Sequence, residues 1–475
     1  EKSAGRTDGA IWTGRGAAVT AVILRGSPWP PRRLPGVTGP VIDLRTTAMA
    51  VGGETVARDP EGRVVFVSGA VPGELVRVEL FDERKRFARA SVIEVLEAAP
   101  ERVTPACPHV ARGCGGCDWQ HIDPVAQSAF RLTMVRDVLA REGGVDDPVV
   151  EPGVALSPVG LRTTVRGTAG ADGRFAFRRR RSNDAVEVDS CLVAHPLVAE
   201  LVAEGRFGTA DDVTIRVGAR TGERLVVVSP RAAGVRVPDD VQVIGTDQLR
   251  KGRRAWIHEE AAGRTWRVSA QSFFQASPEG AEALVHEVQA MVDRWAPHHT
   301  RLVDLCCGVG LFAGAVLSEE PGQRVVGVER NASAVADARH NLSDDPVRIV
   351  KVAMGKWRPS AADVVVADPA RSGLAHEGVW AVAGTGAGLC VLVSCDPASL
   401  GRDARLFAEV GYRHVGSTVL DLFGHTGQAE VVSAFVLDPD AAAVVAAGQD
   451  PSAGADGSDG DEGDDARGPG EGEGW

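Results

Sequence analysis

Ser394-Cys395-Asp396-Pro397 directly follows the apolar run Leu389–Val393. A buried strand that ends in a cysteine presents a thiol at the sheet edge where open α/β sheets bind their ligands. Cysteine is also commonly buried as a small hydrophobic residue. A helix is expected to begin near Ser399, and its N-terminal amides would favour the thiolate form of Cys395. We therefore predict that Cys395 is a nucleophile.

Residues 302–312 combine an apolar strand, the turn Gly308-Val309-Gly310 and the start of a helix. This arrangement presents backbone amides to a nucleoside cofactor. Glu329 ends the next predicted strand, where a carboxylate can bind both hydroxyls of a ribose. A dinucleotide-binding loop would have a third glycine at position 313, where this chain has Ala. The turn alone could be structural, but its context favours a cofactor without a pyrophosphate, such as S-adenosylmethionine.

Asp368 directly follows the apolar run Val364–Ala367 and begins the string Asp368-Pro369-Ala370-Arg371-Ser372-Gly373. An aspartate before a proline is often only a turn former. The carboxyl ends of parallel strands meet at one edge of a sheet, so Asp368 is expected beside the glycine turn and Cys395. We interpret it as a ligand contact.

Four further cysteines form a second candidate site. Cys107, Cys114 and Cys117 lie within eleven residues, and Cys191 is the only other cysteine before residue 306. This spacing is typical of metal ligands more than of a disulfide framework. Four thiolates can hold either zinc or an iron–sulfur cluster, and the spacing alone leaves both open.

The order of elements predicts how these residues are positioned. Short strands with glycine turns between residues 41 and 99 indicate a small barrel. Residues 101–265 add strands near 161–167 and 173–178 and a helix near 196–204. Beyond residue 301, strands at 301–306, 324–329, 347–352, 363–368 and 389–394 alternate with helices, and strands at 412–420 and 429–437 form a final pair. We predict an α/β fold with a doubly wound, mostly parallel sheet.

Composition and length bound the function. The 475 residues suffice for two or three domains, and 44% hydrophobic with 24% charged residues is typical of a soluble globular protein. No apolar run approaches the ~18 residues of a membrane helix. Residues 440–475 carry ten acidic residues and one basic residue, which is three quarters of the net charge of −12. We expect a cytoplasmic monomer without a membrane partner.

The predicted domain limits follow from these changes in composition. Residues 1–40 are Arg-, Gly- and Pro-rich and are predicted to be a disordered extension, and residues 439–475 an acidic disordered tail. Between them we predict a barrel at 41–100, a central α/β domain with the cysteines at 101–265, and a catalytic domain at 266–438.

Two segments mix basic and aromatic residues, as RNA-binding surfaces do. They are residues 84–89 (Arg-Lys-Arg-Phe-Ala-Arg) in the barrel and residues 174–181 (Arg-Phe-Ala-Phe-Arg-Arg-Arg-Arg) in the central domain. Basic residues contact phosphates and aromatic rings stack on bases. A solvated strand face is the structural alternative for each.

Together these strings resemble the RNA uracil-5 methyltransferases of the TRAM-domain type, which make 5-methyluridine in transfer and ribosomal RNA. The resemblance covers residues 41–437. The cofactor loop of the family matches 304–312, its Asp-Pro-Pro-Arg-x-Gly matches 368–373, its Ser-Cys-Asn-Pro matches 394–397, and its Asp-x-Phe-Pro-x-Thr-x-His-x-Glu matches 421–430. The chain departs from these motifs at five positions: Cys306, Ala370, Asp396, Gly424 and Gln428.

The resemblance implies a Rossmann-like class I methyltransferase domain after an OB-like TRAM barrel, with RNA as partner and S-adenosylmethionine as cofactor. It implies that Cys395 is the nucleophile and Glu430 the base, and that the cofactor contacts are Gln275, Cys306, Glu329 and Asp368. It also implies that Cys107, Cys114, Cys117 and Cys191 hold a 4Fe–4S cluster, with zinc as the alternative.

The chemistry explains these residue types. Carbon 5 of uracil is a poor nucleophile, so a thiolate adds to carbon 6 and creates an enolate that accepts the methyl group. A base, here Glu430, then removes the proton from carbon 5, and the thiol is eliminated. The target base must leave the RNA stack.

Two alternatives remain open. A non-catalytic iron–sulfur RNA-binding protein could retain the fold, although the intact pair of Cys395 and Glu430 argues against it. A cytosine-5 DNA methyltransferase uses the same thiol chemistry, but the barrel argues against that class.

Overall fold

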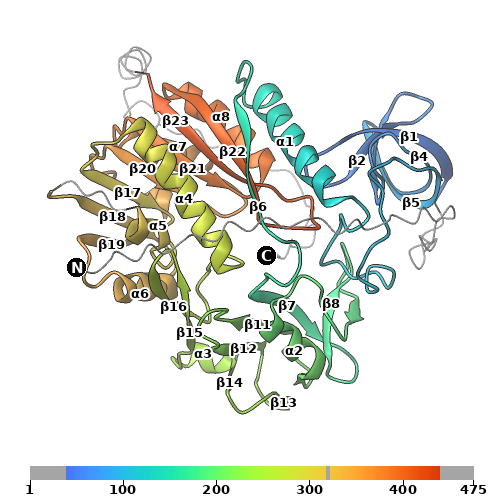
Figure 1. The fold of residues 1–475 in the computed structure, drawn as a ribbon, viewed down its shortest axis with the longest axis horizontal. Helices are drawn as coiled ribbons and strands as arrows, with labels where there is room; N and C mark the ends of the chain where they lie inside the picture. The colour runs from blue at the N-terminus through green and yellow to red at the C-terminus, as the bar shows by residue number, and fades with distance from the viewer. Residues whose placement is uncertain (1–38, 317–320, 439–475) are drawn as a thin grey trace, which may run out of the picture.

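The computed structural model describes residues 39–316 and 321–438. These residues form a small barrel, a central sheet and a larger sheet between two layers of helices (Figure 1). The predicted extension and tail lie outside the described residues, apart from Gly39 and Pro40. In the described ranges, no helix combines the length and the apolar character that crossing a membrane requires.

The N-terminal barrel is closed and has the strand order β1-β2-β3-β5-β4, which confirms the predicted small barrel. Along its strands, buried and more exposed residues alternate because every second side chain points into the core. Val65 and Val67 do so in one strand, and Val76 and Val78 in another. The strands are β1 (Val41–Met49), β2 (Thr55–Arg58), β3 (Val64–Ser68), β4 (Leu75–Glu83) and β5 (Phe87–Glu97).

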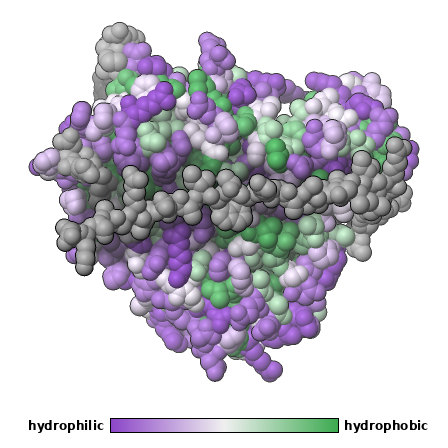
Figure 2. All heavy atoms as spheres, viewed as in Figure 1, coloured by the Kyte–Doolittle hydropathy of each residue, from purple (hydrophilic) through white to green (hydrophobic). Residues whose placement is uncertain are grey.

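The central part is a six-stranded sheet in the order β14-β12-β11-β7-β8-β9. It lies at the bottom of Figure 1, with α2 and α3 beside it. Its elements are β7 (Thr164–Ala169), β8 (Phe175–Arg178), β9 (Ala185–Glu187), α2 (Pro196–Glu204), β11 (Asp212–Val217), β12 (Arg224–Ser229), β14 (Val241–Gly245) and α3 (Thr246–Arg250), with the small pair β10 (Arg206–Phe207) and β13 (Val235–Arg236). The face in Figure 2 is mostly hydrophilic over this part, and apolar residues gather towards its middle.

The catalytic sheet has eight strands in the order β19-β18-β17-β20-β21-β23-β22-β6. Five neighbouring strands are parallel and β23 is antiparallel to β21, as the sequence predicts. The strands are β17 (Arg301–Leu305), β18 (Arg324–Glu329), β19 (Val347–Lys351), β20 (Val364–Ala367), β21 (Leu389–Ser394), β22 (Tyr412–Asp421), β23 (Glu430–Leu437) and β6 (Val150–Ala155).

Helices cover both faces of this sheet because its strands are apolar on both sides. Val364 and Val366 pack in one core with α4, α5 and α6, whereas Val365 and Ala367 pack in a second core with α1, α7 and α8. The helices are α1 (Pro124–Arg141), α4 (Pro278–Trp295), α5 (Leu311–Ala315), α6 (Ala332–Asn341), α7 (Ala375–Ala383) and α8 (Pro397–Glu409), with a 3-10 turn at Met354–Lys356.

The predicted boundary between residues 265 and 266 does not separate two structural units. It falls inside the hairpin of β15 (Trp256–Ala261) and β16 (Arg264–Ser269), and β6 joins the catalytic sheet although it precedes this boundary by more than a hundred residues. The sequence of β6 contains Pro152 and Gly153 and has no alternating pattern. Gly153 is required there because a β-carbon would lie 2.7 Å from Cγ2 of Thr418 in β22.

Candidate active site

Cys395 and Glu430 come together through the antiparallel register of β21 and β23. Ser394 pairs with Val431, so one step further along the same register places Cys395 opposite Glu430. Cys395 is half-buried, and Glu430 is 3% exposed. Helix α8 begins directly afterwards, and its N-cap Asp396 accepts a hydrogen bond from the amide of Ser399 at 3.3 Å. The two predicted catalytic residues therefore share one end of the sheet.

The surroundings of Cys395 favour the protonated thiol. Burial, together with the charges of Glu430 and Asp368, raises the pKa of Cys395 to about 12, and nearby Arg371 opposes this only in part. Burial and Asp368 also raise the pKa of Glu430 well above its ordinary value. The stabilisation of a Cys395 thiolate by the N-terminus of α8 therefore stays a prediction, and burial is the main effect that opposes it.

Asp368 follows β20 on the same sheet edge and contacts another predicted residue. The side-chain amide of Gln275 donates to Oδ2 of Asp368 at 3.2 Å. Burial raises the pKa of Asp368 to about 7, and the hydrogen bond from Gln275 opposes that rise. These two residues, separated by 93 positions in the chain, thus form one side of the site.

The loop that carries Gln275 is held by buried polar contacts. Asp337 of α6 accepts from the hydroxyls of Ser269 at 2.8 Å and Ser272 at 2.6 Å. On the other side, Arg216 donates to the backbone carbonyls of the same two serines at 2.9 and 2.7 Å. A loop without regular structure needs such partners for its polar groups, and here they fix the approach of Gln275 to Asp368.

The glycine turn has the left-handed backbone that its residues suggest. Gly308 and Gly310 have φ values of 54° and 97°, and Cys306 has a φ of 71°, which is unusual for a residue with a side chain. Oε2 of Glu329 accepts from the amide of Gly308 at 3.0 Å, and Oε1 accepts from the amide of Asn331 at 2.6 Å. Glu329 therefore lies directly against the turn.

Asp304 is a residue of this site that the sequence reasoning missed. Its Oδ2 accepts from the amide of Ala313 at 2.8 Å, while its buried Oδ1 has no hydrogen-bond partner. Burial, with the charges of Asp368 and Glu329, raises the pKa of Asp304 to about 8. A carboxyl oxygen without a partner beside a glycine turn fits a site that receives a polar ligand. An aspartate inside an otherwise apolar strand was the available signal.

Cys306 connects the glycine turn to the rest of the site. Its sulfur lies 3.8 Å from the sulfur of Met354, in the 3-10 turn after β19, a contact that the sequence did not indicate. Burial and the charges of Glu329 and Asp368 raise the pKa of Cys306 to about 12. The six predicted catalytic and cofactor residues are therefore neighbours in the structure.

The four N-terminal cysteines also gather in one place. Each is half-buried and free of a disulfide. Burial, together with the charges of Cys117, Cys191 and Cys107, raises the pKa of Cys114 to about 12. Among the residues that the structure describes, no group of three or more His, Cys, Asp or Glu side chains is arranged to hold a metal ion. The 4Fe–4S cluster and its zinc alternative therefore stay predictions.

The two basic segments differ in what their side chains contact. In the central segment, Arg178 pairs with Asp212, Arg180 donates to the carbonyl of Gly52, and Arg181 pairs with Glu54 at 2.9 Å. These contacts within the molecule favour the structural alternative for residues 174–181. At the tip of the β4–β5 hairpin, residues 84–86 are exposed, although Arg84 pairs with Asp82 at 2.8 Å and Arg89 of the same segment pairs with Glu54.

One departure from the expected motifs has a local explanation. At Gly424, a β-carbon would lie 2.4 Å from Cβ of Pro158. A proline at position 424 would therefore collide with Pro158, which already packs against this turn. The loop keeps its path to Glu430 with glycine at that position.

The chain is similar to known RNA methyltransferases. Two family models match the chain, the TRAM domain at residues 41–93 and the methyltransferase small domain at residues 276–379. A protein of Streptomyces avermitilis described as an uncharacterized RNA methyltransferase is 35% identical over 436 residues, which span 85% of this chain and 99% of that protein. The 23S rRNA (uracil(1939)-C(5))-methyltransferase RlmD of Chromohalobacter salexigens is 31% identical over 439 residues, which span 82% of this chain and 87% of that protein. This chain belongs to the TRAM-domain RNA uracil-5 methyltransferases.

The fold of this methyltransferase has a solved counterpart. The tRNA (uracil-54, C5)-methyltransferase of Pyrococcus abyssi, solved with S-adenosyl-L-homocysteine, superposes with a TM-score of 0.65 at 21% identity. The match covers 83% of this chain and all of that one. The two proteins therefore share their fold.

Proposed function

We propose that this enzyme methylates carbon 5 of a uridine in RNA through a covalent adduct between Cys395 and carbon 6 of the base. The observation that carries the proposal is the register that sets Cys395 opposite Glu430, with Asp368 beside both. A nucleophile and a base must lie on the same uracil ring, one at carbon 6 and the other at the proton on carbon 5.

The reaction begins with the thiol of Cys395, whose proton passes to solvent as the sulfur bonds to carbon 6. The electron pair of the carbon 5–carbon 6 double bond moves into the ring carbonyl and gives an enolate, so that carbon 5 becomes nucleophilic. S-adenosylmethionine, when bound, would supply the methyl group to carbon 5, with its carbon–sulfur bond breaking to leave S-adenosylhomocysteine. The ring is then saturated at carbons 5 and 6, and it stays attached to the protein.

Glu430 completes the reaction in the proposed sequence. Its carboxylate takes the proton from carbon 5, the electrons of that carbon–hydrogen bond restore the double bond, and the sulfur of Cys395 leaves. Burial raises the pKa of Glu430 well above its ordinary value, so the carboxyl must lose its own proton before it can accept the one on carbon 5. Overall, one hydrogen of the base is replaced by a methyl group and one proton is released.

The cofactor residues have the chemistry that S-adenosylmethionine needs. Glu329 and the glycine turn offer a carboxylate and backbone amides to a nucleoside, and Asp368 offers negative charge to a sulfonium. The unpartnered oxygen of Asp304 and the left-handed turn at Cys306–Gly310 are features of a ligand cradle. We propose Gln275, Cys306, Glu329 and Asp368 as its contacts.

The cysteines at 107, 114, 117 and 191 are proposed to hold a 4Fe–4S cluster. Their mutual electrostatic influence supports a shared position, and four thiolates are the ligands that such clusters take. Methyl transfer needs no electrons, so the role proposed for the cluster is structural or RNA-positioning.

The proposed substrate is ribosomal or transfer RNA. The relative from Chromohalobacter salexigens is named for uracil 1939 of 23S rRNA, and the enzyme of Pyrococcus abyssi for uracil 54 of tRNA. The test is mass spectrometry of nucleosides from ribosomal and transfer RNA of cells with and without the protein. Loss of 5-methyluridine from one RNA class is expected, and unchanged 5-methyluridine at every site would contradict the proposal.

A further inference from the structure

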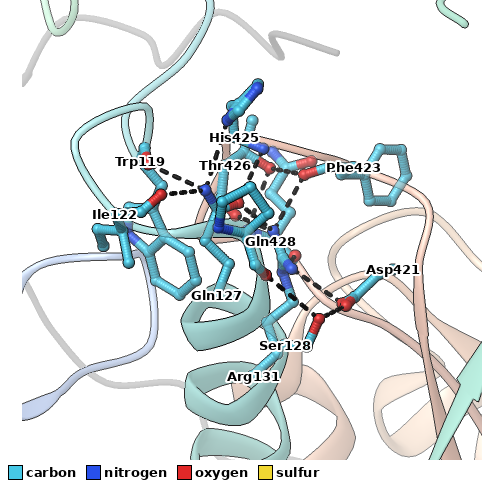
Figure 3. A network of polar contacts seen from close by, with 11 residues as sticks. Trp119, Ile122, Gln127, Ser128, Arg131, Asp421, Phe423, His425, Thr426 and Gln428 are labelled. Carbon is cyan, nitrogen blue, oxygen red and sulfur yellow. Dashed lines mark hydrogen bonds and ion pairs between the residues drawn. The ribbon is translucent and has the colours of Figure 1, made fainter. Parts of the chain in front are cut away.

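A buried arginine outside the motifs binds the loop that leads to Glu430. Arg131, in the middle of α1, is 2% exposed. Its guanidinium donates to Oδ1 of Asp421 at 2.8 Å and to the backbone carbonyls of Phe423 at 3.2 Å, Thr426 at 2.7 Å and Gln428 at 2.8 Å. Figure 3 shows these contacts converging on one side chain from the far end of the chain.

The neighbours of Arg131 on α1 bind the same loop. Gln127 accepts from the amide of His425 at 3.0 Å, and Ser128 donates to Asp421 (Figure 3). His425 has a φ of 63°, a left-handed conformation that a residue with a side chain adopts only when its surroundings impose it. One face of α1 therefore fixes the shape of residues 421–428.

The segment after Cys117 holds the loop from a second side. The amides of Asp118 and Trp119 donate to the carbonyl of His425 at 3.1 and 2.9 Å, and the amide of Gly427 donates to Oδ1 of Asp118 at 3.1 Å. The indole of Trp119 donates to the carbonyl of Gly53 in the barrel at 2.9 Å. The loop of residues 421–428 thus lies between α1, the segment after Cys117 and the barrel.

Burying a guanidinium costs free energy, because the charged group loses its hydration. Burial lowers the pKa of Arg131, and the nearby charges of Asp421 and Asp118 oppose that effect, so the cation is kept by its acceptors. Three of those acceptors are backbone carbonyls between residues 423 and 428. These carbonyls lie outside strands and helices, so they need a hydrogen-bond donor from elsewhere. Arg131 therefore specifies the path of the loop, and this path ends at Ala429 and Glu430.

We propose that Arg131 is a positioning residue for Glu430. It fixes residues 421–428 so that the carboxylate meets the proton on carbon 5 after methyl transfer. This inference rests on the proposed function, because Glu430 needs such precision only if it is the base. A displacement of about 1 Å at a reacting group can cost about 100-fold in rate.

The role predicts a defect in one step. Proton removal and thiol elimination come after the methyl transfer, so a misplaced Glu430 leaves the methylated base bonded to Cys395. A merely structural role would instead reduce cofactor binding, adduct formation and turnover together.

The test compares Arg131→Met and Arg131→Lys with a matched control, Arg136→Met. Arg136 lies on the same helix and donates to the carbonyl of Val150 at 3.0 Å, away from the loop. Each full-length variant is incubated with S-adenosylmethionine and RNA that lacks 5-methyluridine. Denaturation-resistant protein–RNA adduct, turnover, S-adenosylhomocysteine affinity and thermal unfolding are measured.

For Arg131→Met we expect turnover to fall by about 100-fold while the adduct accumulates and cofactor affinity stays within about twofold. Arg131→Lys should restore part of the turnover, because an ammonium keeps the charge and reaches fewer acceptors. Arg136→Met should match the wild type. Equal loss of turnover without adduct, or equal behaviour of Arg131→Met and Arg136→Met, would overturn the proposal.

Two further variants separate this inference from the proposed function. Glu430→Gln should trap the adduct; if it does not, the proposed chemistry itself fails. If Glu430→Gln traps the adduct and Arg131→Met does not, only the role of Arg131 is refuted. Should Arg131→Met fail to fold, Asp421→Asn gives the second measurement, since it keeps an acceptor for Arg131 and removes the charge. A smaller accumulation of adduct is then expected, and its absence counts against the proposal.

Discussion

Cys395 is partly buried and lies among carboxyl groups, and both raise the pKa of its thiol. The raised pKa protects a partly accessible cysteine, because the protonated thiol is a poor nucleophile towards oxidants. If Cys395 is the nucleophile, as we propose, the thiol has to be activated when the cofactor and the base replace water around these groups.

We predict that Cys395→Ala abolishes turnover and leaves cofactor affinity within about twofold, because the thiol acts only on the base. Asp368→Ala is the comparison variant and should weaken S-adenosylhomocysteine binding. Isothermal titration with S-adenosylhomocysteine and a methylation assay measure the two effects. A loss of affinity in Cys395→Ala as large as that in Asp368→Ala would show that Cys395 is structural.

Asp304 makes stability depend on pH. Its pKa is raised to about 8 in the folded protein and lies near 4 in the unfolded chain. Between these values the folded state binds the additional proton, so the free energy of unfolding falls as the pH rises from about 4 to about 8. Denaturant unfolding at pH 5 and pH 8 should show a smaller fall for Asp304→Asn than for the wild type. The same fall in both would contradict this account.

At the scale of elements, the close approach of the barrel and the catalytic loop depends on two glycines. A β-carbon on Gly427 would lie 2.5 Å from the α-carbon of Gly53, which itself has a φ of 81°. Backbone cannot yield as a flexible side chain does, so Gly427→Ala should destabilise the protein by about 1–3 kcal/mol. The control is Gly416→Ala in β22, where a β-carbon meets nothing within 4 Å. Thermal unfolding measures both, and equal midpoints would refute the prediction.

The elements that the sequence predicted well are those with strong local patterns. Strands β18 and β21 and helix α2 have the predicted limits, because apolar runs and a proline at the first helical position mark them. Cys395, Glu430 and Asp368 could be predicted as site residues because they stand at the ends of such strands or in motifs. The raised pKa of Cys395 could not be foreseen, because it comes from burial and from carboxyl groups on other strands.

What the sequence could not reveal depends on distant contacts. Strand β6 has no periodic pattern and becomes a strand only beside β22. The role of Arg131 depends on residues nearly 300 positions later, and an arginine on a helix is ordinarily a solvated residue. The predicted monomer and cytoplasmic location stay predictions.

At the scale of the whole molecule, the segment that follows Cys117 lies between the barrel and the loop of residues 421–428. Trp119 and Asp118, directly after Cys117, contact both. We predict that Cys114→Ser weakens RNA binding more than cofactor binding, because Cys114 pairs with Arg179 beside the central sheet, whereas the cofactor turn belongs to the catalytic sheet. Filter binding of RNA and calorimetry with S-adenosylhomocysteine measure the two affinities, and equal losses would contradict a separate role.

The proposed cluster is tested on the wild-type protein. Protein purified without oxygen should be brown and contain about four irons per chain if the cysteines hold 4Fe–4S, since thiolate-to-iron charge transfer absorbs visible light. Colourless protein with one zinc per chain would overturn that assignment and leave the methyltransferase chemistry untouched.

The contact between Arg131 and Gln428 spans 297 residues. A ribosome makes α1 and β6 long before it makes their partners, β22 and the loop that follows. During synthesis Arg131 therefore lacks its acceptors in residues 421–428, and β6 lacks its neighbour β22, until those late segments have been made. Contacts this distant in the chain form late, and the contact between Arg131 and Gln428 is among the last that synthesis allows. A chain cut short before residue 421 would lack this contact and Glu430 as well.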